Sequence, residues 1–132
     1  MPVIRRADAR RTETPGGVMT TLASPAQGGA DVAVWHTAAP AGSRGPRHTF
    51  DSAQVWTFLT GDATIDLDGE TLSLAEGDTA VLPADLPRQV VAGSAGFTAV
   101  VAGPAGMQVY DAVTDCDLAR ELGERATPPW IV

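Results

Sequence analysis

Short apolar or alternating runs separated by turn residues occupy most of the 132-residue chain, and this pattern limits the possible folds more than any other feature. Runs of this length and spacing are typical of β-strands in a sandwich or barrel. The sequence therefore predicts an all-β fold. The expected strands are residues 18–23, 32–37, 47–50, 55–59, 63–67, 70–74, 79–82, 88–92, 96–102 and 108–113.

Turn residues between these runs support the same interpretation. Asp68-Gly69 predicts a two-residue hairpin, because both central positions of that turn favour a positive φ. Three further breaks are expected at Gly61-Asp62, at Gly77-Asp78 and at the corner between Pro83 and Pro87.

The chain divides into three expected parts. Residues 1–17 form an N-terminal arm or edge strand, either solvated or exchanged between two copies. Residues 18–114 form the barrel, and residues 115–132 form a short helix over 115–123 and a stiff tail. Trp130 follows two prolines, so we expect it to pack the tail onto the barrel or onto a neighbouring copy.

Composition narrows the class of protein. Hydrophobic residues make up 44% and charged residues 19%, which is typical of a globular domain. The formal net charge of −7 argues against binding to nucleic acid or to an anionic membrane surface, since both need a basic face. No apolar run approaches the roughly 20 residues of a spanning helix, and Cys116 is the only cysteine. We therefore expect a cytoplasmic protein.

One segment carries a spaced set of residues around a histidine. Gly42 is followed by five residues and then His48, and Phe50, Gln54 and Gly61 follow at fixed distances. This arrangement resembles the first motif of the cupin superfamily. In that motif a second histidine stands at the position of Phe50 and a glutamate at the position of Gln54.

A second segment resembles the second cupin motif. Gly77 and Pro83 match its glycine and proline, whereas Asp85, Arg88 and Ala92 stand where the motif has glycine, histidine and asparagine. The resemblance covers residues 42–92 and implies a single-domain cupin β-barrel, or jelly roll. Similarity to small bacterial cupins also implies a homodimer, built partly by exchange of an N-terminal strand.

The departures from the motifs bear on metal binding. A metal-binding cupin typically offers three histidines and a glutamate, and here only His48 remains. A fixed guanidinium at Arg88 would oppose a divalent ion ~5 Å away by several kcal/mol at an effective dielectric constant of ~20. We expect no tightly bound metal or other cofactor. A weak divalent site would use His48, Gln54 and His36, if His36 points inward.

Strand periodicity predicts which side chains share the pocket, because alternate residues face the same side. His48 is then accompanied by Phe50, Gln54 by Trp56 and Phe58, and Arg88 by Val90. The expected catalytic residues are His48, Arg88 and Gln54. The expected substrate-binding residues are Phe50, Trp56, Phe58 and Val90.

These residues predict acid–base chemistry on a small molecule. A neutral His48 would be the general base, Gln54 would orient a carbonyl or hydroxyl, and Arg88 would hold an anionic group or stabilise an enolate. Alternatively, Arg88 turns to the rim and pairs with Asp51 or Asp85. The predicted function is a metal-independent isomerase, lyase (dehydratase) or cyclase. Two alternatives are a metal-dependent oxygenase or isomerase and a non-catalytic binding protein.

Overall fold

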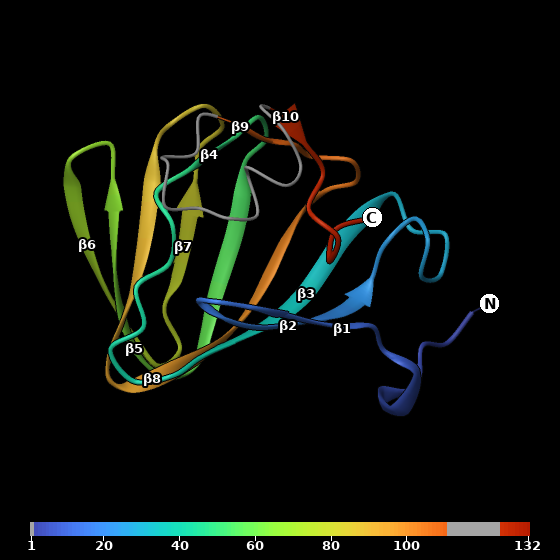
Figure 1. Cartoon of the computed structure of the whole chain (residues 1–132), viewed down its shortest axis with the longest axis horizontal. Helices are drawn as coiled ribbons and strands as arrows, with labels where there is room; N and C mark the ends of the chain where they lie inside the picture. The colour runs from blue at the N-terminus through green and yellow to red at the C-terminus, as the bar shows by residue number, and fades with distance from the viewer. Residues whose placement is uncertain (1, 111–124) are drawn as a thin grey trace.

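A computed structural model describes residues 2–110 and 125–132 of the chain (Figure 1). Within these residues almost all regular structure is β-strand, so the prediction of an all-β fold is confirmed. The elements are η1 (Arg6–Asp8), β1 (Arg11–Thr14), β2 (Gly17–Ala23), β3 (Val32–Ala39), β4 (Thr49–Phe50), β5 (Gln54–Leu67), β6 (Glu70–Ala75), β7 (Thr79–Leu82), β8 (Arg88–Pro104), β9 (Val109–Tyr110) and β10 (Arg125–Ala126).

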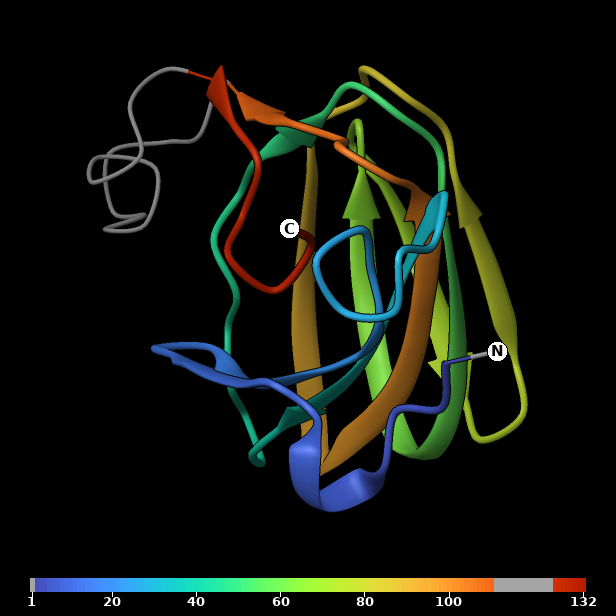
Figure 2. The ribbon, with the colours of Figure 1, turned by 90° about the vertical axis from the view of Figure 1, so that its right-hand side faces the viewer.

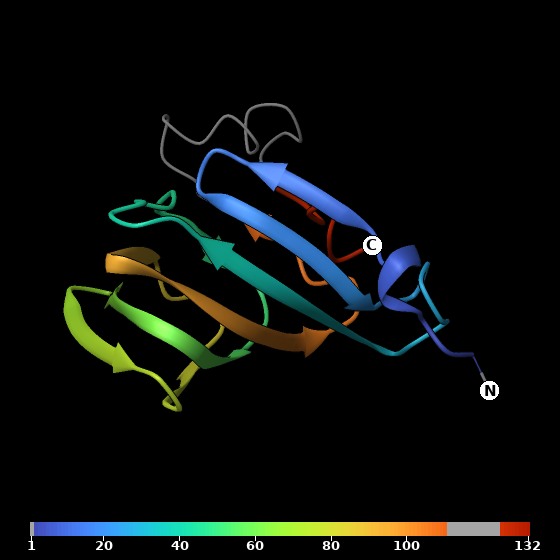
Figure 3. The ribbon, with the colours of Figure 1, turned by 90° about the horizontal axis from the view of Figure 1, so that it is seen from below.

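The described strands form two antiparallel sheets. The large sheet has the order β1-β2-β3-β8-β5-β6, with β7 also paired to β5, and Figure 3 shows these strands side by side. The small sheet has the order β10-β9-β4 and lies across one end of the barrel (Figure 2). Buried side chains of the two sheets and of the tail make up one hydrophobic core.

Two long strands, β5 and β8, connect the halves of the large sheet. The sequence predicted a turn at Gly61-Asp62, but this prediction is wrong, because β5 continues through these residues with a shift in its pairing to β8. Gly61 has a φ of 76°, and a Cβ at this position would collide with the carbonyl of Gly96. Glycine is thus required for a bulge that bends the strand without ending it.

The tight hairpin between β5 and β6 is as predicted. Asp68 and Gly69 have φ values of 50° and 87°, so both central residues adopt the left-handed conformation that a type I′ turn needs. This turn fixes the register of β6 on β5, with Leu67 opposite Glu70. The pairing places Ile65 and Leu74 in the core.

Other expected elements differ at their ends. The expected strand 47–50 is regular only over Thr49–Phe50, and His48 instead forms an isolated bridge with Arg88. The strand expected at 108–113 is described as Val109–Tyr110, and its remainder lies outside the described residues. The helix expected at 115–123, with Cys116, also lies outside them. Residues 11–14 form β1, which pairs with β2 of its own chain.

The C-terminal tail is tied to the start of the chain. The hydroxyl of Thr21 donates a hydrogen bond to the carbonyl of Trp130 at 2.7 Å. The hydroxyl of Ser24 and the guanidinium of Arg10 both donate to the carbonyl of Val132. Trp130 and its neighbour in the tail, Ile131, are buried in the core. The tail therefore forms a wall of the barrel. Among the described residues, no helix is long and apolar enough to cross a membrane.

Candidate active site

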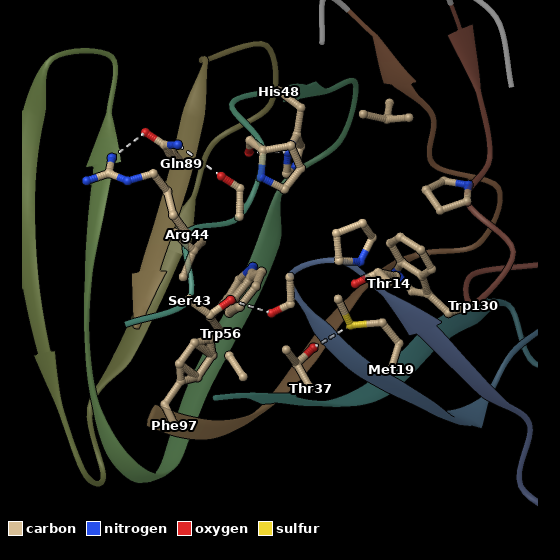
Figure 4. Close-up of a pocket in the computed structure, with 18 of the residues that line it drawn as sticks. Thr14, Met19, Thr37, Ser43, Arg44, His48, Trp56, Gln89, Phe97 and Trp130 are labelled. Atoms are coloured by element: carbon tan, nitrogen blue, oxygen red, sulfur yellow. Dashed lines mark hydrogen bonds between the residues drawn. The ribbon is translucent and has the colours of Figure 1, made fainter. Parts of the chain in front are cut away.

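A cavity of about 200 Å³ lies between the inner face of the large sheet, the segment 43–50 and the C-terminal tail. Figure 4 shows side chains from β2, β3, β5 and β8 around it, with His48 on one side and Trp130 on another. Most of the surface that lines the cavity is apolar. A largely apolar hollow with a few polar groups is typical of a small-molecule site.

His48 is the imidazole that lines this cavity. Its Nδ1 lies 2.9 Å from the carbonyl oxygen of Pro46, which can only accept a hydrogen bond, so Nδ1 carries the proton. The ring meets the edge of Phe50 at a centroid distance of 5.1 Å, with an angle of 81° between the planes. The lone pair of Nε2 has no hydrogen-bond partner within the described part of the chain.

The environment of His48 favours its neutral form. The pKa of His48 is lowered from 6.5 to about 4. Burial is the largest cause, the hydrogen bond to Pro46 partly opposes it, and the positive charge of Arg88 adds a smaller lowering. At neutral pH the imidazole is therefore uncharged. An uncharged imidazole with a free Nε2 can accept a proton from a bound molecule.

Aromatic rings make up much of the cavity wall. Phe50, Trp56 and Val90, all expected in the pocket, line the cavity, and so do Phe97 and Trp130. The residue expected beside them, Phe58, is fully buried and stacks behind Trp56 at a centroid distance of 6.1 Å. The structure therefore places Phe58 in the core and not on the cavity surface.

Gln54 faces the interior but does not line the cavity. Its Oε1 accepts a hydrogen bond from the indole N–H of Trp56 at 3.1 Å, and its Nε2 donates to the sulfur of Met107 at 3.2 Å. Only 1% of the residue is exposed. Gln54 thus fixes the orientation of Trp56, and its expected role in orienting a substrate is not supported by this geometry.

Arg88 is also interior and lies outside the cavity lining. Its guanidinium donates hydrogen bonds to the carbonyl oxygens of Pro83 at 2.7 Å and Leu86 at 3.1 Å, and lies 5.9 Å from the centroid of Phe50. The residue is 0% exposed, so neither expected position, the cavity or the rim, is the one observed. Burial lowers the pKa of Arg88, and Tyr110 and Asp85 oppose that shift. The side chain braces the Pro83–Pro87 corner with its positive charge behind Phe50.

The residues present do not fit a cupin metal site. The four motif positions hold His48, Phe50, Gln54 and Arg88. Phe50 has no atom that can bind a metal, and the amide of Gln54 is hydrogen-bonded to Trp56 and Met107. Arg88 is a cation and would repel a metal ion. The described residues contain no cluster of three His, Cys, Asp or Glu side chains that could hold an ion. One imidazole alone is too few for a mononuclear site, which normally uses at least three protein ligands.

His36 cannot complete such a set in this geometry. Its neighbours on β3, Trp35 and Thr37, are buried on the inner face, and Thr37 lines the cavity. Because side chains alternate along a strand, His36 faces the opposite side of the sheet.

Sequence reasoning missed several walls of the cavity. The end of β1 and the turn after it contribute Thr14, Pro15 and Gly16. The segment before His48 contributes Ser43, whose hydroxyl donates to the carbonyl of Gly16 at 2.8 Å. Phe97 and Trp130 add two rings. Their aromatic character was the available signal, but only the fold shows which apolar residues of distant segments meet around His48.

Several solved structures share the architecture of this chain. The polyketide cyclase RemF from Streptomyces resistomycificus is 18% identical, with a TM-score of 0.68 and 81% of each chain covered. KdgF from Halomonas sp. is 19% identical, with a TM-score of 0.66, and the match covers 79% of this chain and 94% of that one. An RmlC-like cupin from Shewanella frigidimarina is 17% identical, with a TM-score of 0.66 and coverage of 78% and 90%.

Oxalate decarboxylase from Bacillus subtilis also matches, at 17% identity and a TM-score of 0.67. The match covers 74% of this chain but only 28% of that chain, so this protein spans less than a third of the decarboxylase. No protein-family model and no curated protein matches the sequence. On the strength of its architecture, the chain has the fold of the cupin superfamily, as the spacing of residues 42–92 predicted.

Proposed function

We propose that the protein is a small-molecule enzyme in which the Nε2 of His48 acts as a general base without a tightly bound metal. One observation carries the proposal: an imidazole that is neutral at pH 7, with its proton fixed on Nδ1, presents a free lone pair to an apolar cavity. A base in this position can take a proton from a carbon next to a carbonyl group. The electron pair of the C–H bond then forms the enolate, and the proton returns to carbon or oxygen in the product.

The depressed pKa restricts the substrate. A base with a pKa of about 4 is fully unprotonated at neutral pH, but it is weak, and general bases work best near their own pKa. The proton that it removes must therefore be acidic, such as one on a carbon between two carbonyl groups. A cavity of about 200 Å³ with aromatic walls favours a small, flat, largely apolar molecule. The fold match to a polyketide cyclase supports this class of reaction.

The charge of Arg88 supports the same step from outside the cavity. Its guanidinium lies behind Phe50, and no carboxylate of the described residues is paired with it within salt-bridge distance. A fixed positive potential near the cavity stabilises negative charge that develops on an enolate oxygen.

Benzoylacetone, an aromatic 1,3-diketone, provides a direct test. Its keto–enol interconversion is followed by ultraviolet absorbance at pH 6–7, with wild-type protein and with the His48→Gln variant. We expect acceleration by the wild type and a loss of at least about 100-fold in the variant, the usual contribution of a general base. Equal rates for the two proteins would overturn the proposal.

The same assay separates the metal-dependent alternative. Protein without a His-tag is dialysed against a chelator and assayed before and after addition of divalent iron, zinc or nickel. Retained activity after dialysis is the result expected for His48 acting alone. Activity that disappears with the chelator and returns with one metal would show that the cavity works with an ion.

A second candidate function is non-catalytic binding of a small molecule. The cavity favours it because polar side chains around His48 already bond within the protein: Ser43 to Gly16, Gln89 to the carbonyl of Gly45, and Thr37 to the sulfur of Met19. Few polar groups are left to act on a substrate. Saturable binding of benzoylacetone, measured by quenching of tryptophan fluorescence, without any acceleration would support this candidate.

A further inference from the structure

Three side-chain hydroxyls of the described residues line the cavity, and they differ in what they bond to. The hydroxyls of Ser43 and Thr14 donate to backbone carbonyl oxygens, at 2.8 and 3.0 Å. The hydroxyl of Thr37 instead donates to the sulfur of Met19 at 3.1 Å. A thioether sulfur is a weak acceptor, so Thr37 carries the hydroxyl that a ligand can redirect most easily.

Thr37 lies on the inner face of β3, directly opposite Met19 on β2. Only 3% of the residue is exposed, so its hydroxyl is shielded from bulk water. Ala39, the next residue on this face of the strand, and Ala99, the partner of Thr37 on β8, have only methyl side chains. These small neighbours leave the hydroxyl accessible from the cavity.

His48 and Thr37 lie on opposite sides of the cavity, as Figure 4 shows. A flat molecule between them presents one edge to the imidazole and the other edge to the hydroxyl. In the folded conformer of a 1,3-diketone both oxygens lie on one edge and the central carbon lies on the opposite one. The placement of the two side chains therefore suits a 1,3-dicarbonyl compound. The described residues that line the cavity include no Asp or Glu that would repel an anion.

We propose that the hydroxyl of Thr37 binds the enolate oxygen that forms when His48 removes a proton from the substrate. The inference rests on the proposed function, because the negative charge arises in that step. Nε2 takes the proton, the electron pair of the C–H bond becomes the C=C bond of the enolate, and the π pair of the carbonyl moves onto its oxygen. Thr37 turns its O–H from sulfur to that oxygen and keeps its own proton. The imidazolium then returns the proton to carbon or oxygen of the product.

The change of acceptor favours the transition state over the bound substrate. A hydrogen bond to an ionised oxygen is roughly twice as strong as one between neutral groups. The neutral carbonyl must compete with the sulfur of Met19 for the hydroxyl, whereas the developing oxyanion is a much better acceptor than either. The interaction thus strengthens as charge develops, which is the condition for it to accelerate the reaction.

A diketone whose enol titrates near neutral pH separates enolate binding from catalysis. Benzoyltrifluoroacetone is titrated from pH 5 to pH 9 with an excess of His48→Gln protein, and the ultraviolet spectrum reports the bound enolate. This protein has no general base and no titrating imidazole in the cavity. Adding Thr37→Val, which replaces the hydroxyl with a methyl group, is expected to weaken enolate binding roughly tenfold and to raise the pKa of the bound ligand by about one unit.

Two further substitutions in the same protein control for changes in packing. Thr37→Ser keeps a hydroxyl at this position and is expected to retain tight enolate binding. Thr57→Val removes a hydroxyl from the outer face of β5, where it contacts Thr79, and is expected to change nothing. Circular dichroism checks that each variant is folded.

The kinetic arm uses protein with His48 present and benzoylacetone as substrate. Thr37→Val is expected to lower kcat at least about tenfold with little change in KM, because the lost hydrogen bond is strong only in the transition state. A merely structural role for Thr37 would not move the pKa of the bound ligand.

The outcomes distinguish this inference from the proposed function. Enolate binding that depends on Thr37, without acceleration of benzoylacetone by the wild type, would remove the general base and keep Thr37 as the donor to the enolate. Acceleration that needs His48, with equal enolate binding by the Thr37→Val protein and its parent, would rule out Thr37. A loss that Thr37→Ser does not restore, or no enolate binding by any variant, would rule it out as well.

Discussion

His48 and Arg88 are paired on adjacent segments through two backbone hydrogen bonds of 3.0 and 2.8 Å, yet their side chains meet very different surroundings. The histidine uses one nitrogen on the carbonyl of Pro46 and leaves the other open to the cavity. The arginine donates from Nε and Nη2 to the carbonyls of Leu86 and Pro83, its Nη1 has no hydrogen-bond partner among the described residues, and the residue is fully buried.

The difference between these neighbours shows what separates a site residue from a structural one. Both occupy positions where metal-binding cupins carry ligands, and both face the interior. His48 lines the cavity, whereas Arg88 lies outside its lining and has two of its three guanidinium nitrogens bonded to carbonyls of the Pro83–Pro87 corner. His48 therefore belongs to the site, and Arg88 belongs to the frame that holds it.

The largest expected effect is on stability, in Arg88→Met. The substitution removes every guanidinium hydrogen bond to the Pro83–Pro87 corner and leaves the carbonyls of Pro83 and Leu86 without these donors. We expect the free energy of unfolding to fall by about 3 kcal/mol or more, measured by urea denaturation. A loss below about 1 kcal/mol would mean that Arg88 is not a structural brace.

A pH-dependent effect of similar or smaller size is expected at His48. Its pKa is about 4 in the folded protein and about 6.5 in the unfolded chain, so the unfolded state binds more protons between these values. Stability from this residue is thus complete above pH 6.5 and is lost as the pH falls toward 4, by roughly 3 kcal/mol at most. The difference in unfolding free energy between wild type and His48→Gln, followed from pH 7 to pH 4, measures it. A difference that does not vary with pH would contradict a buried neutral imidazole.

An intermediate effect is expected in Gln54→Leu. The indole N–H of Trp56 then loses its acceptor while it stays buried, which costs about 1–3 kcal/mol. Urea denaturation measures the loss, and tryptophan fluorescence reports the altered environment of Trp56. If Gln54 instead contacted ligand directly, benzoylacetone binding would weaken far more than stability falls.

The smallest effect is expected at the surface pair of Arg47 and Asp66, which gives a control for Arg88. The two charged groups are 3.0 Å apart with 39% and 36% of their side chains exposed. We expect Arg47→Gln to lower the free energy of unfolding by less than about 1 kcal/mol, because water screens exposed pairs. Equal losses in Arg47→Gln and Arg88→Met would remove the contrast between an exposed and a buried arginine.

Spacing and periodicity predicted the fold and the face of each strand well. The spacing around Gly42, His48, Gly77 and Pro83 led to the fold that the structure has, and Phe50, Trp56 and Val90 line the cavity, as the alternation predicted. Periodicity gives the side on which a residue lies but not its depth. Phe58 shares the face of Trp56, yet it lies one layer deeper.

Four features depended on tertiary contacts that one sequence does not display. The carbonyl acceptors of Arg88 come from a corner whose shape the sequence leaves open, and Gln54 is occupied by Met107 from a distant segment. Gly61 looked like a turn because glycine with a positive φ serves turns and bulges alike. Trp130 reaches the cavity only because the tail folds back onto β2.

The central claim is that His48 is a neutral base, with its proton on Nδ1 and its Nε2 facing the cavity. Nitrogen-15 NMR of histidine-labelled protein, titrated from pH 7.5 to pH 3.5, measures this directly, and the His48→Gln variant assigns the signal. The account predicts the Nδ1–H tautomer, a pKa of about 4, and a shift of the Nε2 resonance when benzoylacetone is added. A pKa near 6.5, or a proton on Nε2 at neutral pH, would contradict it.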